Sequence, residues 1–189
     1  MKKAYIIPGF GEYATDDQYQ KLNTIFSSAG YTPEFIALDW SMSIDTWIRE
    51  AEKMMQEPNA IVCGFSFGAY IGVLLCDKLR AQHLFACSLS PYFSDDIEQL
   101  PHDALNYFGK DHIAQFAAHT FPKESQTPTT FFFGDRDWDY AIKKTRDRSA
   151  EWHGPSTFIL VPEAEHSLAN TTYLNLLEKE IEKLPNYTD

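Results

Sequence analysis

The sequence is short of positive charge and of cysteine. Its 189 residues include 16 lysines and arginines against 27 aspartates and glutamates, which gives a formal net charge of −11. Because such a chain repels a phosphate backbone, we expect no nucleic-acid partner. Only three cysteines are present, and Cys63, Cys76 and Cys87 all lie within apolar runs. An odd number in such surroundings predicts buried free thiols and favours a reducing compartment.

Long hydrophobic runs are also missing. No stretch approaches the roughly 20 apolar residues that a membrane-spanning helix needs. After the basic start MKK, only four residues precede Pro8, which is too short a run for the core of a signal peptide. We therefore expect no membrane span and a cytoplasmic location.

The chain does hold enough apolar sequence for one packed core. Apolar residues make up 44% and aromatic residues 15% of the chain, and its length suits a single domain over 1–189. Stretches with helical periodicity alternate with short runs rich in β-branched or aromatic residues. This alternation predicts an α/β fold with an open, mostly parallel six-stranded sheet and helices on both faces. The expected strands are 4–7, 35–38, 60–63, 84–89, 129–133 and 157–161.

Three of the expected helices have boundary signals. Thr15 is placed to cap a helix that Gly30 ends. Ser43 and Asn170 are placed to cap the second and the last helix. The segment 92–128 breaks this rhythm, because it is long, mixed in composition and punctuated by prolines. Such an insertion after a strand is either a short lid or a surface crossover.

The sequence GFSFG joins an apolar strand to an apolar helix and fits the pattern GxSxG. In that context the pattern forms a turn so tight that only small residues fit at Gly64 and Gly68, and the hydroxyl of Ser66 projects above the sheet. The backbone N–H of Phe67 then faces any oxyanion formed at the serine, assisted by the helix dipole. The alternative is a packing turn around a serine without chemical function.

A serine nucleophile needs a general base, and the base needs a carboxylate to orient it. His166 lies in the loop between the last strand and the last helix, from where it can reach across the top of the sheet. Asp135 and Asp137 follow the fifth expected strand at the same edge, which is where open parallel sheets bind ligands. We predict no metal site, because even His112 and His119 are too far apart on a helix to share one ion. The histidines typical of surface positions are His83, His102, His112, His119 and His153.

The sequence PGFGEYA after the first strand fits the dinucleotide-binding pattern GxGxxG/A, with Asp39 placed as the acid that binds a ribose. The same turn can instead supply a backbone donor to an oxyanion. Glu12, Asp16 and Asp17 oppose dinucleotide binding, because these carboxylates would lie where a pyrophosphate needs a positive helix end.

With these features together, the sequence resembles the α/β-hydrolase family over nearly its whole length. The order Ser66, Asp137, His166 is that family's order of nucleophile, acid and base, and GFSFG, GDRD and EHS stand at the three positions. The resemblance implies a minimal α/β-hydrolase fold and a serine hydrolase that works through an acyl-enzyme without a cofactor. In the family the acid is usually the last residue of a GxxD turn, which is Asp137 here, and Asp135 is the alternative. Glu165 stands where the family often has a glycine.

The resemblance also assigns the first loop to an oxyanion hole. The family has at this place a turn that supplies the second backbone donor, which points to the N–H of Phe10 beside that of Phe67. Pro8 stands where many relatives have a histidine. Asp39 is then a polar residue at the end of a strand, and dinucleotide binding becomes the weaker alternative. The other alternative is a protein without catalytic activity that binds a partner through 92–128.

Aromatic residues gather in the loops expected at the active edge. Tyr13, Trp40, Tyr92 and Trp138 are candidates for substrate binding, since together they could form an apolar pocket. Such a pocket and an acidic chain suit a small uncharged ester or thioester, with peptidase and lactonase activities as alternatives. One basic stretch suits either a coenzyme A phosphate or a solvated helix face: Lys143, Lys144, Arg146 and Arg148.

Overall fold

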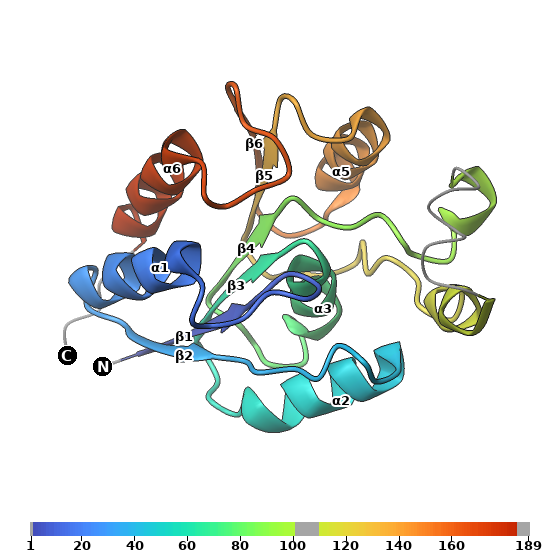
Figure 1. Cartoon of the computed structure of the whole chain (residues 1–189), viewed down its shortest axis with the longest axis horizontal. Helices are drawn as coiled ribbons and strands as arrows, with labels where there is room; N and C mark the ends of the chain where they lie inside the picture. Colours follow the sequence, from blue (N-terminus) through green and yellow to red (C-terminus); the bar gives the residue numbers. More distant parts are fainter. Residues whose placement is uncertain (1, 101–109, 185–189) are drawn as a thin grey trace.

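A computed structural model describes residues 2–100 and 110–184, which form an α/β structure (Figure 1). Six strands make one sheet in the order β2-β1-β3-β4-β5-β6, and every neighbouring pair is parallel. The predicted open parallel sheet is confirmed. The strands are β1 (Lys3–Ile7), β2 (Thr32–Phe35), β3 (Ile61–Phe65), β4 (His83–Cys87), β5 (Thr129–Gly134) and β6 (Ser156–Val161).

Helices cover both faces of the sheet, as the sequence predicts (Figure 1). This arrangement follows from right-handed connections between parallel strands. Each face carries its own apolar core, so the sheet is buried on both sides. No helix in the described part of the chain is long and apolar enough to cross a membrane. The helices that cover the sheet are α1 (Asp17–Ser28) and α6 (Thr171–Glu182) on one face, and α2 (Ile44–Met54), α3 (Phe67–Leu75) and α5 (Asp139–Glu151) on the other.

The central strands are apolar along their length, as expected of strands covered on both faces. Successive side chains of β4 enter opposite cores, with Leu84 on the α3 side and Phe85 on the α1 side. The three cysteines are buried free thiols, as predicted. Burial raises the pKa of the Cys76 thiol to about 11, so this side chain stays protonated at neutral pH.

His83 differs from its predicted place in a surface turn. It is the first residue of β4 and is partly buried, and its Nε2 lies 3.0 Å from the hydroxyl oxygen of Thr130 on β5. Burial lowers the pKa of His83 to about 4, because the charged imidazolium loses its hydration. This histidine is therefore neutral in the folded protein at neutral pH.

Two of the three predicted helix caps are confirmed. The Ser43 hydroxyl and the Asn170 carboxamide each accept a hydrogen bond from an N–H in the first turn of α2 and α6. Gly30 follows the end of α1 with φ of 84°, a left-handed conformation that glycine adopts without strain. The prediction of Thr15 as a cap is wrong. Asp16 takes that position, and its carboxylate accepts from a loop N–H instead of from the helix.

The strand β2 lies three residues earlier than the sequence predicts. Its pairing with β1 matches Phe35 to Ile6, and the N–H of Ile36 still donates to the Ile6 carbonyl oxygen at 2.9 Å. The apolar run after Phe35 leaves the sheet and covers the core, where Ile36 is buried. Pro33 lacks an N–H, which an edge strand tolerates. The apolar run 35–38 therefore indicates burial in the core, but it does not give the position of the strand.

The described parts of the segment 92–128 pack into the body of the protein. Phe93 is buried in the core before the short 3₁₀ helix η1 (Ile97–Gln99), and Phe116, which ends the helix 110–116, is also buried. The Gln115 side-chain oxygen accepts the N–H of Ile44 at 2.8 Å, which ties the segment to the start of α2. The described flanks are therefore packed against the core. A short lid or a crossover over 92–128 stays a prediction, because 101–109 lie outside the described residues.

Candidate active site

Ser66 lies on the turn between β3 and α3, at the carboxyl edge of the sheet. Its backbone has φ of 54° and ψ of −115°, which is strained for a residue other than glycine. The flanking glycines make the turn possible. A Cβ on Gly64 would overlap the carbonyl group of Gly68, and a Cβ on Gly68 would overlap that of Ile7. Two positions without side chains thus allow the backbone to lift the serine hydroxyl above the sheet.

The loops after β5 and β6 lie against each other and carry the other two polar residues. A Cβ on Gly134 would overlap the carbonyl group of Ala164, and the N–H of Arg136 donates to the same carbonyl oxygen at 2.9 Å. This close approach of two backbones brings Asp137 next to His166.

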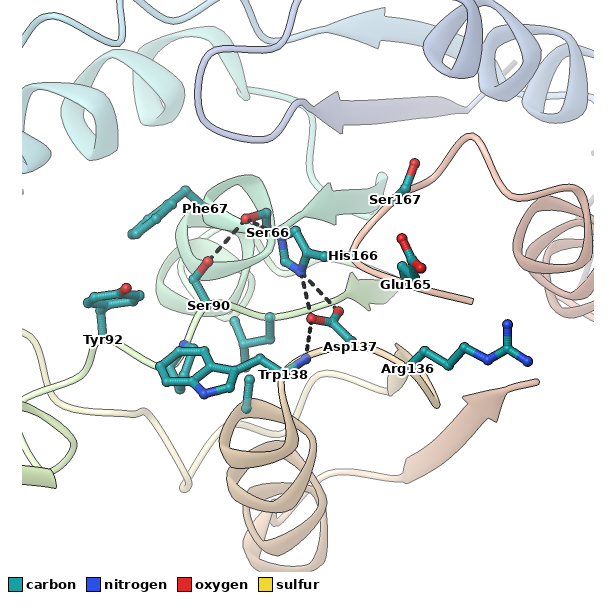
Figure 2. Close-up of a pocket in the computed structure, with 13 residues that line it drawn as sticks. Ser66, Phe67, Ser90, Tyr92, Arg136, Asp137, Trp138, Glu165, His166 and Ser167 are labelled. Carbon is teal, nitrogen blue, oxygen red and sulfur yellow. Dashed lines mark hydrogen bonds and ion pairs between the residues drawn. The ribbon is translucent and has the colours of Figure 1, made fainter. Parts of the chain in front are cut away.

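His166 joins Ser66 to Asp137 in one hydrogen-bonded chain (Figure 2). Its Nε2 lies 3.0 Å from Ser66 Oγ, and its Nδ1 lies 3.0 and 2.9 Å from the two carboxylate oxygens of Asp137. The Asp137 side chain is 2% exposed, whereas that of His166 is 47% exposed. Asp135, the alternative acid, lies exposed at the surface. The structure therefore aligns carboxylate, imidazole and hydroxyl in the order that proton transfer requires.

The loop after β1 forms a turn that Glu12 holds. The N–H of Glu12 donates to the Gly9 carbonyl oxygen at 3.0 Å, and its Oε2 accepts from the Gly9 N–H at 3.0 Å. The Tyr19 hydroxyl donates to the same Oε2 at 2.5 Å, and burial raises the pKa of Tyr19 far above its ordinary value. Phe10 lies at the corner of this turn, and its ring centroid is 6.1 Å from that of Phe67. The two residues predicted to supply backbone donors are thus in contact through their rings.

A cavity of about 560 Å³ opens beside the Ser66 hydroxyl. The aromatic side chains of Phe67, Tyr92 and Trp138 lie on one side of Ser66, while Arg136 lies on the other side and points away (Figure 2). Leu89, Pro91 and Ala141 also line the cavity and extend its apolar wall.

Of the four residues predicted to bind substrate, two line this cavity. Tyr92 and Trp138 lie in its wall. Tyr13 and Trp40 are not among the described residues that line it. Tyr13 is 61% exposed at the surface, and the Trp40 ring packs on Trp47 with 5.0 Å between their centroids. The loop after β2 therefore uses its tryptophan to cover the core, not to reach the serine.

Sequence reasoning misses Ser90. This residue follows β4 by three positions, its side chain is buried at 5% exposure, and its Oγ lies 3.1 Å from Ser66 Oγ. The one available signal was its place after an apolar strand, at the same edge as the other site residues. No spacing motif marks a serine there.

The basic stretch on α5 does not form one surface. Arg148 is 4% exposed, and its Nη2 lies 3.0 Å from a carboxylate oxygen of Asp95 and 2.7 Å from one of Asp96. Its guanidinium also lies over the rings of Phe93 and Phe121. Both predictions for this residue, a coenzyme A site and a solvated face, are wrong, because the buried Asp96 and the exposed Asp95 pair with its charge. Across residues 2–100 and 110–184, no group of three or more His, Cys, Asp or Glu side chains could hold a metal ion.

Comparison with solved structures identifies the fold. Est1E from Butyrivibrio proteoclasticus superposes with a TM-score of 0.80 at 12% identity, over 96% of this chain and 85% of that one. Alpha/beta hydrolase domain-containing protein 10 from mouse gives 0.80 at 14% identity, over 95% and 88%. The alpha/beta hydrolase MGS-MChE2, from a metagenome of lagoon sediments at Mar Chica, Morocco, gives 0.73 at 19% identity, over 96% and 90%.

These likenesses show that the chain has the α/β-hydrolase fold. They concern the fold alone, since fold does not fix function. No protein-family model and no curated protein matches the sequence.

Proposed function

We propose that the protein is a serine hydrolase that cleaves a small ester or thioester through an acyl-enzyme intermediate. The observation that carries this proposal is the hydrogen-bonded chain from Asp137 through His166 to Ser66. The serine lies on a strained turn beside a cavity, and such strain clusters at functional sites. A serine that served packing alone would not need an imidazole and a buried carboxylate aligned behind it.

In the proposed cycle, His166 Nε2 takes the Ser66 proton as Oγ forms its bond to the carbonyl carbon of the substrate. Asp137 accepts the hydrogen bond from Nδ1–H, which fixes the tautomer and stabilises the imidazolium. The proton on Nε2 then passes to the leaving alcohol or thiol as the bond to the carbonyl carbon breaks. A water molecule next gives a proton to the same nitrogen and attacks the acyl group. Ser66 recovers this proton when the acid product leaves.

The proposed oxyanion donors are the backbone N–H groups of Phe10 and Phe67. Phe67 is the first residue of α3, where the helix dipole is positive. Phe10 lies at the corner of the turn that Glu12 holds. In sites of this kind, losing one donor costs about 3 kcal/mol of transition-state stabilisation.

The cavity favours an uncharged acyl group as the substrate. Its wall beside Ser66 is formed by Tyr92, Trp138 and aliphatic side chains, which would desolvate a charged group at a cost. The charged side chain of Arg136 lies on the other side of His166 and is 59% exposed. The proposal includes no cofactor. It places the enzyme in the cytoplasm, because three buried free thiols suit a reducing compartment.

The fold neighbours support hydrolysis in general, because two of them are named esterases. Another neighbour, Est1E, has a solved structure with ferulic acid bound. The first loop argues against dinucleotide binding. There the Gly9 N–H, which a pyrophosphate would need as a donor, already donates to the Glu12 carboxylate. A protein that only binds a partner could share the fold, but it predicts no turnover that depends on Ser66.

The first experiment is the intact-protein mass after treatment with a fluorophosphonate. We expect a single adduct on the wild type and none on Ser66→Ala or His166→Ala, because phosphonylation needs the activated hydroxyl. Ser41→Ala, which removes an exposed serine, serves as the matched control and should keep the adduct. A folded wild type without adduct, and without Ser66-dependent turnover of short- and long-chain nitrophenyl esters, would favour the partner-binding alternative.

A further inference from the structure

The hydroxyl of Ser90 contacts the nucleophile from a different side than His166 does (Figure 2). The two serine oxygens are 3.1 Å apart, and both side chains are buried. Among the described residues, Ser66 is the hydrogen-bond partner of the Ser90 hydroxyl. The proposed catalytic cycle does not use this second hydroxyl.

The backbone around Ser90 is fixed on both sides. Ser88 has a left-handed φ of 47°, is fully buried, and donates its N–H to the Phe132 carbonyl oxygen at 2.7 Å. Pro91 follows Ser90 and restricts it to extended conformations. The N–H of Ser90 also points to the carbonyl oxygen of Ser66, at 3.4 Å. Together, the strained Ser88, Pro91 and these backbone contacts fix the chain that carries the buried Ser90 hydroxyl.

Hydrogen-bond accounting fixes the direction of the contact. A serine hydroxyl has one proton to donate and two lone pairs that accept. If Ser66 donated to Ser90, its proton would point away from the base. When Ser66 donates to His166 Nε2, as general-base catalysis requires, the remaining contact must run from the Ser90 proton to a lone pair of Ser66 Oγ.

We infer that Ser90 is a positioning residue. Its hydroxyl donates to Ser66 Oγ, which leaves the Ser66 proton directed at His166 Nε2. This inference rests on the proposed serine hydrolase function. Hydrogen bonds to a charged acceptor are stronger than those between neutral groups, so the contact strengthens as Oγ gains negative charge by passing its proton to His166. It therefore raises the rate of attack and leaves substrate binding in the ground state nearly unchanged.

The test measures the second-order rate of fluorophosphonate labelling, with kcat and KM on the best nitrophenyl ester. Ser90→Ala removes the hydroxyl, Ser90→Thr keeps it, and Ser90→Val has the shape of threonine without it. We expect the Ala variant to be slower than the wild type, and the Val variant slower than the Thr variant, each by about 10- to 100-fold. The loss should appear in the labelling rate and in kcat/KM, and Ser94→Ala, in the same segment but outside the cavity lining, should match the wild type.

The outcomes separate this inference from the proposed function. A labelled wild type with equal rates for the Thr and Val variants would overturn the role of Ser90 and leave the hydrolase proposal intact. A higher KM without slower labelling would also overturn it, because the residue would then act on ester binding. A folded wild type that is not labelled at all would overturn both.

Discussion

Asp137 contacts His166 Nδ1 through both carboxylate oxygens, and its Oδ1 also accepts the N–H of Trp138 at 2.7 Å. Replacing the carboxylate with a carboxamide keeps the shape but presents an N–H to Nδ1. The imidazole would then carry its proton on Nε2 and could not accept from Ser66. We predict that Asp137→Asn lowers kcat by about 10⁴-fold without unfolding the protein. Steady-state kinetics and a melting curve check this.

Asp135→Asn is the matched control for that prediction. Asp135 lies two residues away on the same loop but is exposed, and it donates its N–H to the Val161 carbonyl oxygen through the backbone alone. Its variant should retain wild-type kcat. A reversed pattern, with Asp135→Asn inactive and Asp137→Asn active, would show that the loop rearranges to present the other acid.

At the scale of single residues, the sequence is sufficient to place Ser66, Asp137 and His166 at one edge, because each follows an apolar strand of a parallel sheet. Side-chain direction is harder to predict, since it depends on tertiary contacts. Trp40 donates its Nε1 to the Glu12 carbonyl oxygen, 28 residues away in sequence. Ser90 meets Ser66 only because two neighbouring strands end together. No local pattern encodes either contact.

The first turn of α3 packs directly against the end of β1. A Cβ on Gly68 would overlap the backbone carbonyl group of Ile7, which cannot move without shifting β1. One turn later, a Cβ on Gly72 would meet side-chain atoms of Leu84 at 3.1 Å and Val62 at 3.3 Å, which can adjust. The close approach at Gly68 therefore fixes the distance between the nucleophile turn and the loop after β1.

We predict that Gly68→Ala destabilises the fold by about 3 kcal/mol or more, because the new methyl group overpacks rigid backbone. Gly72→Ala is the matched control in the same helix. There the gain of about 1 kcal/mol in helix propensity offsets a mild contact. Urea unfolding of the two variants measures the difference. Equal free energies of unfolding would mean that α3 can move away from β1 at little cost.

At the scale of elements, alternating periodicity predicts the type and order of strands and helices but not every position. The strand β2 is displaced because its apolar tail is used for covering the core, and strand pairing follows backbone register with β1. The sequence pattern also does not predict which face of α5 is exposed. Its basic stretch suits one exposed face, yet Arg148 points inward. Its guanidinium donates to Asp95 and Asp96, which lie more than 50 residues earlier in the chain.

At the scale of the whole molecule, acid should weaken the fold through His83. Its pKa is about 4 in the folded protein and about 6.5 in an unfolded chain. The unfolded state therefore binds the proton more tightly. The stability that His83 contributes is complete above pH 6.5 and is lost as the pH falls toward 4.

We predict that the wild type loses about 2 kcal/mol more of its free energy of unfolding between pH 7.5 and pH 5 than His83→Gln does. Glutamine cannot titrate and keeps a polar group that can reach Thr130. Chemical unfolding at the two pH values measures this difference, and the other titrating groups cancel between the two proteins. Parallel losses would indicate that water reaches the imidazole and hydrates its charged form.

Ser66 and His166 are 100 residues apart in the chain, and the histidine follows β6, the edge strand farthest from β2. A ribosome adds about 5–20 residues per second, so the nucleophile turn is made roughly 5–20 s before its base. A growing chain therefore carries a serine that is not yet activated by its partners. In the hydrolase we propose, the Ser66 hydroxyl would therefore stay unreactive during synthesis. It would become a nucleophile only when β6 joins the sheet and places His166 beside it.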